Sequence, residues 1–326
     1  MEFGGWSMPR DFQGIIAEHQ TVRKEAGLFD LSHMGRLVVR GEGCDEKLEG
    51  LFTRSIASAG DRRALYGFFL NREGQCLDDL IVYRRSEVEC WLVVNAANRK
   101  KVYKWLENSL PELEVEDVTR DTVLLALQGP KAPKICKRYD LNLPDKPFRA
   151  NWFKGGMVST TGYTGEKGGE LWLGIQPGRE LYRELVGEVQ PCGLGARDSL
   201  RLEKGFPLYG HELGEGIDPV QAGLENFIEW EHEFVGKNRL EKYRDNPPRR
   251  TVKGFKLEGR RSPRPSASVY HRGEERGRVT SASYCPSLER AGGLAIMDRN
   301  IEAGEKIQVE ISGKLTAAEV SKLPLV

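Results

Sequence analysis

Two adjacent carboxylates lie inside an apolar run, Leu77-Asp78-Asp79-Leu80-Ile81-Val82-Tyr83. The run predicts a strand whose side chains alternate between two faces, so one carboxylate can face water while the other faces whatever packs on the sheet. A carboxylate in apolar surroundings must be hydrogen-bonded, paired or protonated, and such groups concentrate at functional sites. The alternative is that both residues lie at the frayed start of the strand, just past a turn at 71–74.

A second candidate is the glycine-rich stretch Thr160-Thr161-Gly162-Tyr163-Thr164-Gly165-Glu166-Lys167-Gly168-Gly169-Glu170, which predicts a turn between two strands. Glycines let the backbone approach a ligand closely. Tyr163 could stack on a flat heterocycle, and either glutamate of the stretch could accept paired hydrogen bonds from a ring amine and amide. The alternative is an ordinary hairpin loop.

A third candidate is the helix that opens at Gly193, which carries Arg197 and Arg201 four residues apart and therefore on one face. Arginine binds planar carboxylates through two parallel hydrogen bonds. The alternative is a pair of structural salt bridges with Asp198 and Glu203.

Single polar and soft residues complete the set. His33 has the side chain of a general base, although a hydrogen-bonded structural histidine at a strand start is the favoured interpretation. Met34 could wall an apolar pocket or fill the core. Tyr66 and Asn95 lie on neighbouring predicted strands, so sheet pairing would bring them close to Asp79, or they could serve sheet packing alone.

The elements that position these residues follow from hydrophobic periodicity and turn signals. Helices are expected at 13–29, 97–109, 130–139, 179–189 and 194–204. Strands are expected at 36–40, 64–70, 76–83, 89–95, 114–118, 122–128, 155–161 and 169–175. Hairpins mixed with crossover helices favour an α+β sandwich over a doubly wound sheet. Beyond residue 250 the pattern is strand and turn throughout, which predicts a small β-barrel.

Composition excludes several classes of protein. At 326 residues the chain is long enough for two or three domains, and its 39% hydrophobic and 30% charged content is that of an ordinary globular protein. A net charge of +1 does not point to nucleic acid or to a membrane surface. There is no apolar stretch of bilayer length and no signal peptide, so a cytoplasmic location is expected. Scattered cysteines and histidines predict no metal site.

A basic stretch follows Lys237 and contains two proline-rich turns, Asn246-Pro247-Pro248 and Arg261-Ser262-Pro263-Arg264-Pro265. It predicts a domain boundary. Its charge indicates either a solvated linker or a docking surface for an acidic partner.

These stretches occur in one collinear order that resembles the aminomethyltransferase family, the T-protein of glycine cleavage. The resemblance runs along nearly the whole chain. Its motifs are Phe3-Gly4-Gly5-Trp6-Ser7-Met8-Pro9, Glu25-Ala26-Gly27-Leu28-Phe29-Asp30-Leu31-Ser32-His33-Met34-Gly35, Asp78-Asp79-Leu80-Ile81-Val82-Tyr83, Val93-Val94-Asn95-Ala96-Ala97-Asn98, Gln128-Gly129-Pro130, Thr161-Gly162-Tyr163-Thr164-Gly165-Glu166, Gly193-Leu194-Gly195-Ala196-Arg197-Asp198, Leu208-Tyr209-Gly210 and Phe234-Val235-Gly236-Lys237.

The resemblance implies a three-lobed cloverleaf, with two ferredoxin-like α/β sandwich lobes and a C-terminal β-barrel around a central folate channel. The first lobe would be discontinuous, formed by 1–30 and 129–245. The second lobe, 31–128, would be inserted into it and carry Asp79. The barrel would span 250–326.

The implied reaction moves an aminomethyl carbon from the lipoyl arm of the acidic H-protein to tetrahydrofolate, with release of ammonia, as a step of glycine catabolism and one-carbon metabolism. The resemblance assigns the catalytic role to Asp79. It assigns the pterin to Tyr163 and Glu170, the channel lining to Met34, Tyr66 and Asn95, and a position near the pterin or aminobenzoate to Arg197. The protein is expected to act as a monomer, with the basic stretch helping to dock H-protein.

Two other functions occur on the same scaffold. One is a folate-binding protein without transferase activity that maintains iron–sulfur enzymes. Its branch typically has a cysteine motif, whereas this chain has Phe234-Val235-Gly236-Lys237 at the corresponding place. The other is a folate-dependent demethylase, which the intact Asp78-Asp79 motif disfavours.

Overall fold

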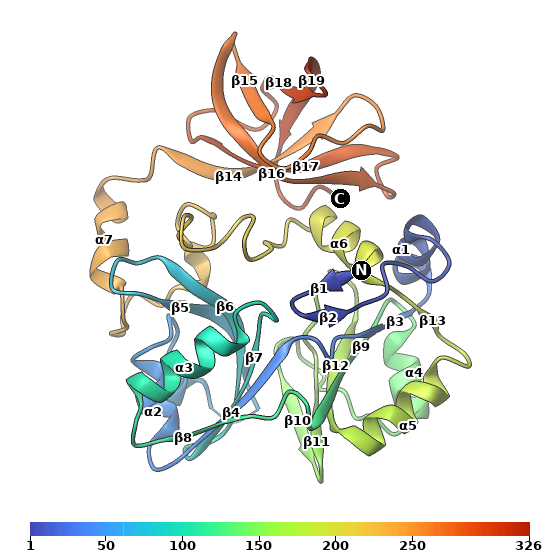
Figure 1. Cartoon of the computed structure of the whole chain (residues 1–326), viewed down its shortest axis with the longest axis vertical. Helices are drawn as coiled ribbons and strands as arrows, with labels where there is room; N and C mark the ends of the chain where they lie inside the picture. Colours follow the sequence, from blue (N-terminus) through green and yellow to red (C-terminus); the bar gives the residue numbers. More distant parts are fainter. Residues whose placement is uncertain (61) are drawn as a thin grey trace.

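The computed structural model describes residues 1–60 and 62–326 and holds three main bodies of β-structure (Figure 1). They are a six-stranded sheet, a five-stranded sheet and a closed barrel. A short pair of strands, β1 (Glu2–Phe3) and β2 (Trp6–Ser7), lies at the N-terminus beside the six-stranded sheet (Figure 1).

The six-stranded sheet collects strands that are far apart in the sequence, in the order β10-β11-β12-β9-β3-β13. The strands are β3 (Gly27–Asp30), β9 (Thr122–Gln128), β10 (Ala150–Phe153), β11 (Gly156–Ser159), β12 (Gly168–Gly174) and β13 (Gln190–Pro191). Two helices, α4 (Ala132–Arg138) and α5 (Ile175–Leu185), pack against β9 and β12. Two more, α1 (Ile15–Lys24) and α6 (Leu194–Glu203), pack against each other below the barrel (Figure 1).

The helix expected at 13–29 is wrong at its C-terminal end, because α1 stops at Lys24 and residues 27–30 form β3. Close packing explains the change. A Cβ on Gly27 would lie 2.5 Å from Cγ2 of Val22 and 2.7 Å from Sγ of Cys192, so the chain passes tightly between helix and sheet as it pairs with Gln128. The apolar residues of this segment fit a helical face and a buried strand equally well.

The helix expected at 179–189 is also displaced, since α5 begins at Ile175 and ends at Leu185. Pro177 lies in the first turn of α5, where a helix tolerates proline because the missing N–H has no partner there. The prediction passed over this start signal.

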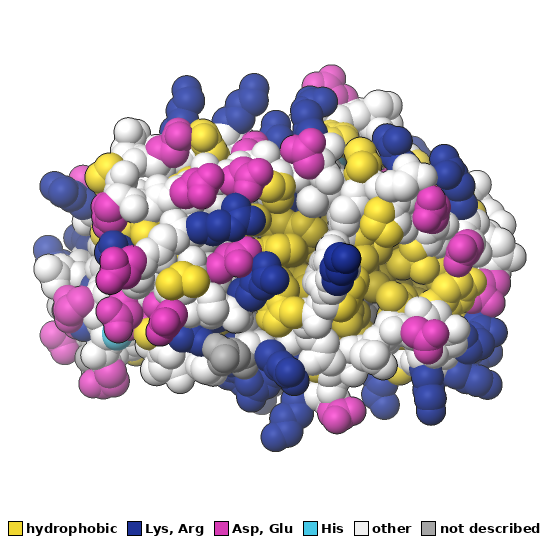
Figure 2. All heavy atoms as spheres, turned by 90° about the horizontal axis from the view of Figure 1, so that it is seen from below, with side chains coloured by type: hydrophobic (Ala, Val, Ile, Leu, Met, Phe, Trp, Pro, Cys, Tyr) yellow, Lys and Arg dark blue, Asp and Glu magenta, His cyan; other side chains and the backbone are white. Residues whose placement is uncertain are grey.

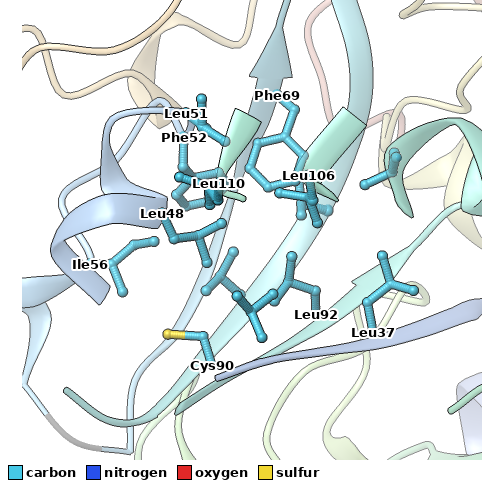
Figure 3. Packing of buried hydrophobic residues seen from close by; sticks show 14 of the residues in the cluster. Leu37, Leu48, Leu51, Phe52, Ile56, Phe69, Cys90, Leu92, Leu106 and Leu110 are labelled. Carbon is cyan, nitrogen blue, oxygen red and sulfur yellow. The ribbon is translucent and has the colours of Figure 1, made fainter. Parts of the chain in front are cut away.

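The five-stranded sheet is contiguous in sequence and antiparallel throughout, in the order β5-β6-β7-β4-β8. Its strands are β4 (Gly35–Arg40), β5 (Ala64–Leu70), β6 (Cys76–Ser86), β7 (Glu89–Val94) and β8 (Glu114–Asp117). One face is covered by α2 (Cys44–Glu49), the 3-10 turn η1 (Ala57–Ala59) and α3 (Arg99–Ser109). Leu48, Phe52, Phe69, Leu92 and Leu106 interlock in this core (Figure 3).

The other face of the five-stranded sheet packs against the six-stranded sheet. Tyr83 and Val93 from the first sheet share a buried cluster with Met157 and Trp172 from the second, and with Leu200 of α6. The odd-numbered residues of β6 from Ile81 to Tyr83 therefore face the junction between the sheets, while Leu80 and Val82 face the helices. This alternation decides where each carboxylate of the acidic pair points.

The closed barrel has the order β14-β17-β16-β15-β18-β19 and confirms the predicted C-terminal β-barrel. Its strands are β14 (Arg250–Leu257), β15 (Ser268–His271), β16 (Glu274–Cys285), β17 (Arg290–Asp298), β18 (Lys306–Ile311) and β19 (Lys314–Ser321). The chain reaches it from α6 through turns, the 3-10 turn η2 (Glu225–Phe227) and α7 (Lys237–Asp245). The basic stretch is therefore more than a linker, because it contains α7 and β14.

A buried ionic cluster joins the barrel to the two helices beneath it. The carboxylate of Glu203 on α6 accepts hydrogen bonds from the backbone N–H and the hydroxyl of Ser287, at 2.9 and 2.7 Å. Arg23 and His19 of α1 lie 2.9 and 3.1 Å from the same carboxylate. Burial alone would raise the pKa of Glu203, but the hydrogen bonds from His19 and Ser287 lower it to about 2.

The α+β fold class is confirmed by these two sheets and the barrel. The pairing of β9 with β3 and β12 places 122–128 in the six-stranded sheet, so the expected boundary of the inserted lobe moves from residue 128 to before Thr122. Residues around Leu213 and Phe234 pack on Phe68 and Cys76 of the five-stranded sheet. The division into three lobes stays a prediction.

Figure 2 shows the molecule from below relative to Figure 1. This face exposes a broad area of apolar side chains, and lysine and arginine side chains border and cross it. Long basic side chains can lay their apolar stems over such a surface while their charged ends stay in water.

Candidate functional site

The acidic pair lies well inside β6, so the frayed-end interpretation is wrong. Asp78 and Asp79 pair with Phe69 and Phe68 of β5 in regular antiparallel register. Asp78 is fully buried on the side of α3, whereas Asp79 is half-buried on the side of the six-stranded sheet. The strand thus separates the two carboxylates onto opposite faces, as alternation requires.

Asn95, which follows β7 directly, links the two carboxylates. Its backbone N–H donates to Oδ2 of Asp78 at 3.0 Å, and its Nδ2 donates to Oδ1 of Asp78 at 2.9 Å. The same Nδ2 lies 2.8 Å from Oδ1 of Asp79 and 3.0 Å from the Asp79 carbonyl oxygen. Asn98 donates a further bond, 2.6 Å long, to Oδ1 of Asp78.

Burial raises the pKa values of both carboxyls. Asp78 is raised by desolvation and then by the negative charge of Asp79, against the stabilising bonds from Asn98 and Asn95. Desolvation also raises the pKa of Asp79, to about 6, although Tyr66 and Asn95 donate to it. Asp79 is therefore an ionised but weakly solvated base near neutral pH, a condition that suits a group that meets a substrate amine.

Tyr66 on β5 holds the second oxygen of Asp79. Its hydroxyl donates to Oδ2 of Asp79 at 3.0 Å, and desolvation keeps the Tyr66 pKa well above its usual value, so the tyrosine stays a donor. The ring is fixed edge-on by Phe68 at 5.5 Å and by Phe227 of η2 at 4.9 Å between centroids. The segment between α6 and the barrel thereby supports the carboxylate site.

The glycine-rich turn places Glu170 on β12, where it is almost fully buried. The hydroxyl of Thr161 donates to Oε2 of Glu170 at 2.5 Å. Tyr83 of β6 lies across the junction, with its hydroxyl 3.0 Å from Oγ1 of Thr161. A carboxylate is thus held in a fixed orientation at the junction of the two sheets.

Tyr163 and Arg197 form a stacked pair beside this carboxylate. The guanidinium of Arg197 lies 4.6 Å from the centre of the Tyr163 ring, whose hydroxyl donates to the Pro207 carbonyl and whose other neighbour is the Phe206 ring. Desolvation lowers the pKa of Arg197, partly offset by Glu170. Among the described residues no hydrogen bond or ion pair of Arg197 is found, so a half-buried cation keeps its donors available for a ligand.

Arg201, one turn further along α6, is structural as expected. It bonds Asp198 at 2.9 Å, which confirms the predicted salt bridge. Its second carboxylate partner is Glu212, at 3.0 Å, and not Glu203, which turns toward Arg23.

Met34 is half-buried and packs on the cluster between the sheets. His33 is buried, with its ring against Phe3 at 5.4 Å. Desolvation, and then the charges of Arg197 and Arg36, lower the His33 pKa to about 3, so this histidine is neutral and is a poor base. Its Nδ1 has no hydrogen-bond partner among the described residues. His33 and Arg197 both line a cavity of about 220 Å³ beneath the N-terminal segment.

The structure thus forms two groups from the predicted site residues. Asp79, Tyr66 and Asn95 form one, and Tyr163, Arg197 and Glu170 form the other. Desolvation, and to a smaller extent the charge of Asp79, raises the pKa of Tyr163. Met34 joins neither by a hydrogen bond. All of these side chains except Glu170 are half-buried, and the channel that they would line stays a prediction.

Sequence reasoning missed four supporting residues: Asn98, Thr161, Tyr83 and Phe227. Asn98 had a signal, because an asparagine near the start of a predicted helix is a common helix-capping residue whose side chain bonds nearby groups. Phe227 had none, since its contact with Tyr66 depends on a long irregular segment.

Comparisons with known proteins place the chain in a family. The family model of the GCVT N-terminal domain matches residues 1–232, and that of the glycine cleavage T-protein C-terminal barrel domain matches residues 249–326. The chain belongs to the glycine cleavage T-protein family. This T-protein family member is 38% identical to an aminomethyltransferase of Aquifex aeolicus over 325 residues, covering 99% of this chain and 91% of the relative.

Other relatives are similarly close. An aminomethyltransferase of Geobacillus kaustophilus is 39% identical over 343 residues, which cover 99% of this chain and 93% of the relative. The crystal structure of the glycine cleavage system aminomethyltransferase T from Bartonella henselae superposes with a TM-score of 0.95 at 31% identity, and the match covers 100% of this chain and 93% of that one.

Proposed function

We propose that this T-protein family member is an aminomethyltransferase that moves the aminomethyl carbon from the lipoyl arm of H-protein to tetrahydrofolate and releases ammonia. Family membership over the whole chain gives the reaction class. The observation that carries the assignment to this chain is the half-buried Asp79 carboxylate, oriented by Tyr66 and Asn95 and facing the six-stranded sheet.

The donor set fits a reduced pterin. Glu170 offers a fixed, buried carboxylate for ring N–H donors, and Tyr163 offers a ring face backed by Arg197. The guanidinium of Arg197, which has no hydrogen bond or ion pair among the described residues, suits a carbonyl or carboxylate oxygen of the folate. Met34 supplies an apolar, adaptable wall. We propose that Glu170, Tyr163 and Arg197 hold the folate, with Met34, Tyr66 and Asn95 along the channel.

When bound, tetrahydrofolate supplies the nitrogen that accepts the carbon. The chain's own contribution is electrostatic: the Asp79 carboxylate positions an amine and stabilises the positive charge that develops as the carbon is transferred. Tyr66 and Asn95 keep the carboxylate aimed, so little reorganisation is needed during the reaction. The raised pKa of Asp79 also makes it a competent proton acceptor.

The carrier contact rests on charge. We propose that the basic stretch around α7 and β14 contributes to docking the acidic H-protein, because opposite charges steer association. A monomeric state and a cytoplasmic location remain predictions. Among the described helices none is long and apolar enough to cross a membrane.

One experiment tests the proposal. The purified protein is incubated with aminomethylated H-protein, with and without tetrahydrofolate, and ammonia and methylenetetrahydrofolate are measured. We expect both products only with folate, and a loss of at least about 100-fold in the Asp79→Ala variant. Folate binding without turnover in the wild type would refute the transferase assignment and support the non-catalytic alternative. Turnover of a methyl donor in place of the aminomethyl donor would support the demethylase.

A further inference from the structure

Asp78, the hidden member of the acidic pair, has a geometry that the proposed reaction does not yet use. We propose that Asp78 is a positioning residue for the transfer: its buried carboxylate fixes Asn95, and Asn95 fixes the catalytic carboxylate of Asp79. The inference rests on the proposed function, because it assigns a role within the same site.

The contacts form an unbroken chain. Asp78 receives two bonds from Asn95, one from the backbone N–H at 3.0 Å and one from Nδ2 at 2.9 Å, and a third from Asn98 at 2.6 Å. The two bonds from Asn95 tie its backbone and its side-chain amide to Asp78, and the bond from Asn98 holds the Asp78 carboxylate in place. Its Nδ2, with only two hydrogens, serves three acceptors within 3.0 Å: Oδ1 of Asp78, Oδ1 of Asp79 and the Asp79 carbonyl. Movement of Asp78 must therefore move the donor that aims Asp79.

Packing alone does not explain a carboxylate at this place. Asp78 is fully buried on the face that its neighbours Leu80 and Val82 fill with apolar side chains, and an apolar residue there would avoid the cost of desolvating a charge. Its hydrogen-bond donors belong to two residues, Asn95 and Asn98, and one of them also contacts Asp79. Asn98, which bonds Asp78, directly precedes α3, so Asp78 lies near the N-terminus of that helix, where negative charge is favoured.

The titratable groups around Asp78 and Asp79 determine whether a titration can report on these two carboxyls. The other titratable groups facing it are Tyr66 on β5, Cys76 on β6, Lys101 on α3, and Tyr163 and Tyr209 from the connecting turns. The pKa values of all five are raised above ordinary values that already lie at or above 9, chiefly by desolvation for the tyrosines and Cys76 and by the bonds with Tyr209 and Glu215 for Lys101. Of the groups named so far, the two carboxyls are therefore the ones that change charge between pH 5 and about 8. Asp218, whose charge acts on Cys76, is a further carboxyl whose pKa is raised by desolvation, so the test must follow Asp79 itself.

The test replaces Asp78 with its isostere in the full chain, Asp78→Asn. Loosening Asn95 should weaken the bond that it donates to Asp79, and because that bond lowers the Asp79 pKa, the acidic limb of the kcat profile should move to higher pH by about one unit. Loss of the aimed geometry should lower kcat roughly 10- to 100-fold while the KM for tetrahydrofolate changes by less than about threefold. Asp45→Asn is the matched control, because Asp45 is also a buried carboxylate of the five-stranded lobe but pairs with Arg84. It should lower the melting temperature and leave the pH limb in place.

A second measurement separates this inference from the proposed function. Carbon-13 NMR of aspartate-labelled protein, assigned with Asp79→Asn, reads the titration of Asp79 without any turnover. If the wild type releases no ammonia, the proposed function fails, yet the Asp79 shift still tests the coupling to Asp78. If the wild type is active but Asp78→Asn keeps its kcat, its pH limb and its Asp79 titration, the inference alone is overturned. Should Asp78→Asn not fold, Asn98→Ala keeps the carboxylate and loosens it; an unchanged kcat there would equally refute the inference.

Discussion

Replacing Tyr66 by phenylalanine should move the acidic limb of the pH–rate profile to higher pH. The substitution removes only the hydroxyl that donates to Oδ2 of Asp79 at 3.0 Å. The ring keeps its edge contacts with Phe68 and Phe227, at 5.5 and 4.9 Å. Because the lost bond stabilises the ionised form of Asp79, the carboxyl will hold its proton to a higher pH.

The size of the effect follows from the bond that is lost. A hydrogen bond to a charged acceptor contributes about 1.5–3 kcal/mol, and each pKa unit corresponds to about 1.4 kcal/mol, so the limb should move by about 1–2 units. With the wild-type pKa of Asp79 at about 6, the variant limb should lie near pH 7–8. The ionised fraction at pH 7 falls from roughly nine-tenths to between one-tenth and one-half, so activity falls roughly two- to tenfold.

The assay is folate-dependent ammonia release from aminomethylated H-protein, measured as kcat/KM from pH 5 to 9. Activity of Tyr66→Phe should recover toward the wild-type level at the alkaline end, because Asp79 is then ionised in both proteins. Tyr103→Phe is the control, since the Tyr103 hydroxyl donates to Glu107 on the exposed side of α3. A limb that stays at the wild-type pH, with activity lowered equally at every pH, would show that the hydroxyl does not set the Asp79 pKa.

Three further predictions concern binding and stability. Glu170→Gln keeps an oxygen that can accept the hydrogen bond from Thr161 but removes the negative charge, so it should weaken tetrahydrofolate binding roughly 10- to 100-fold in a fluorescence titration. An unchanged affinity would mean that the pterin does not bind Glu170. Glu203→Gln should cost roughly 3 kcal/mol of unfolding free energy at pH 7. The Glu203 pKa is lowered to about 2 from 4.5, so its stabilisation is full above pH 4.5 and lost as pH falls toward 2; thermal unfolding of the variant should lack that acid-dependent loss. Gly129→Ala, at φ +135° with a Cβ 2.5 Å from a backbone oxygen, should cost about 1–3 kcal/mol, whereas Gly273→Ala, which meets no atom, should cost less; equal melting temperatures would contradict this.

Local pattern was enough to predict much of the site. The strand that carries Asp79, its hairpin with β5 and the alternation that separates Asp78 from Asp79 all follow from period-two patterning and a turn at 71–74. The glycine-rich turn before β12 and the start of α6 also follow from local signals.

Residues whose role depends on distant partners were harder to predict. The pairing of Arg201 with Asp198 is local and was expected, but Glu203 turned to Arg23 and to Ser287 of the barrel, which no local pattern indicates. Local pattern favours a helix at β3 because the neighbours that make it a strand, β9 and β13, lie far along the chain. Short apolar segments adopt the structure that their tertiary partners impose.

The order of strands in the six-stranded sheet bears on how the chain folds. The five-stranded sheet is built from consecutive segments between Gly35 and Asp117, whereas β3 must wait for β9 and β13 before both of its neighbours are in place. Because pairing between segments far apart in the chain is slow, the five-stranded sheet should become protected during refolding while α1 and β3 remain open. Pulsed hydrogen exchange during refolding should find the amides of β4–β7 protected before those of β3, and simultaneous protection would mean that both sheets form in one cooperative step.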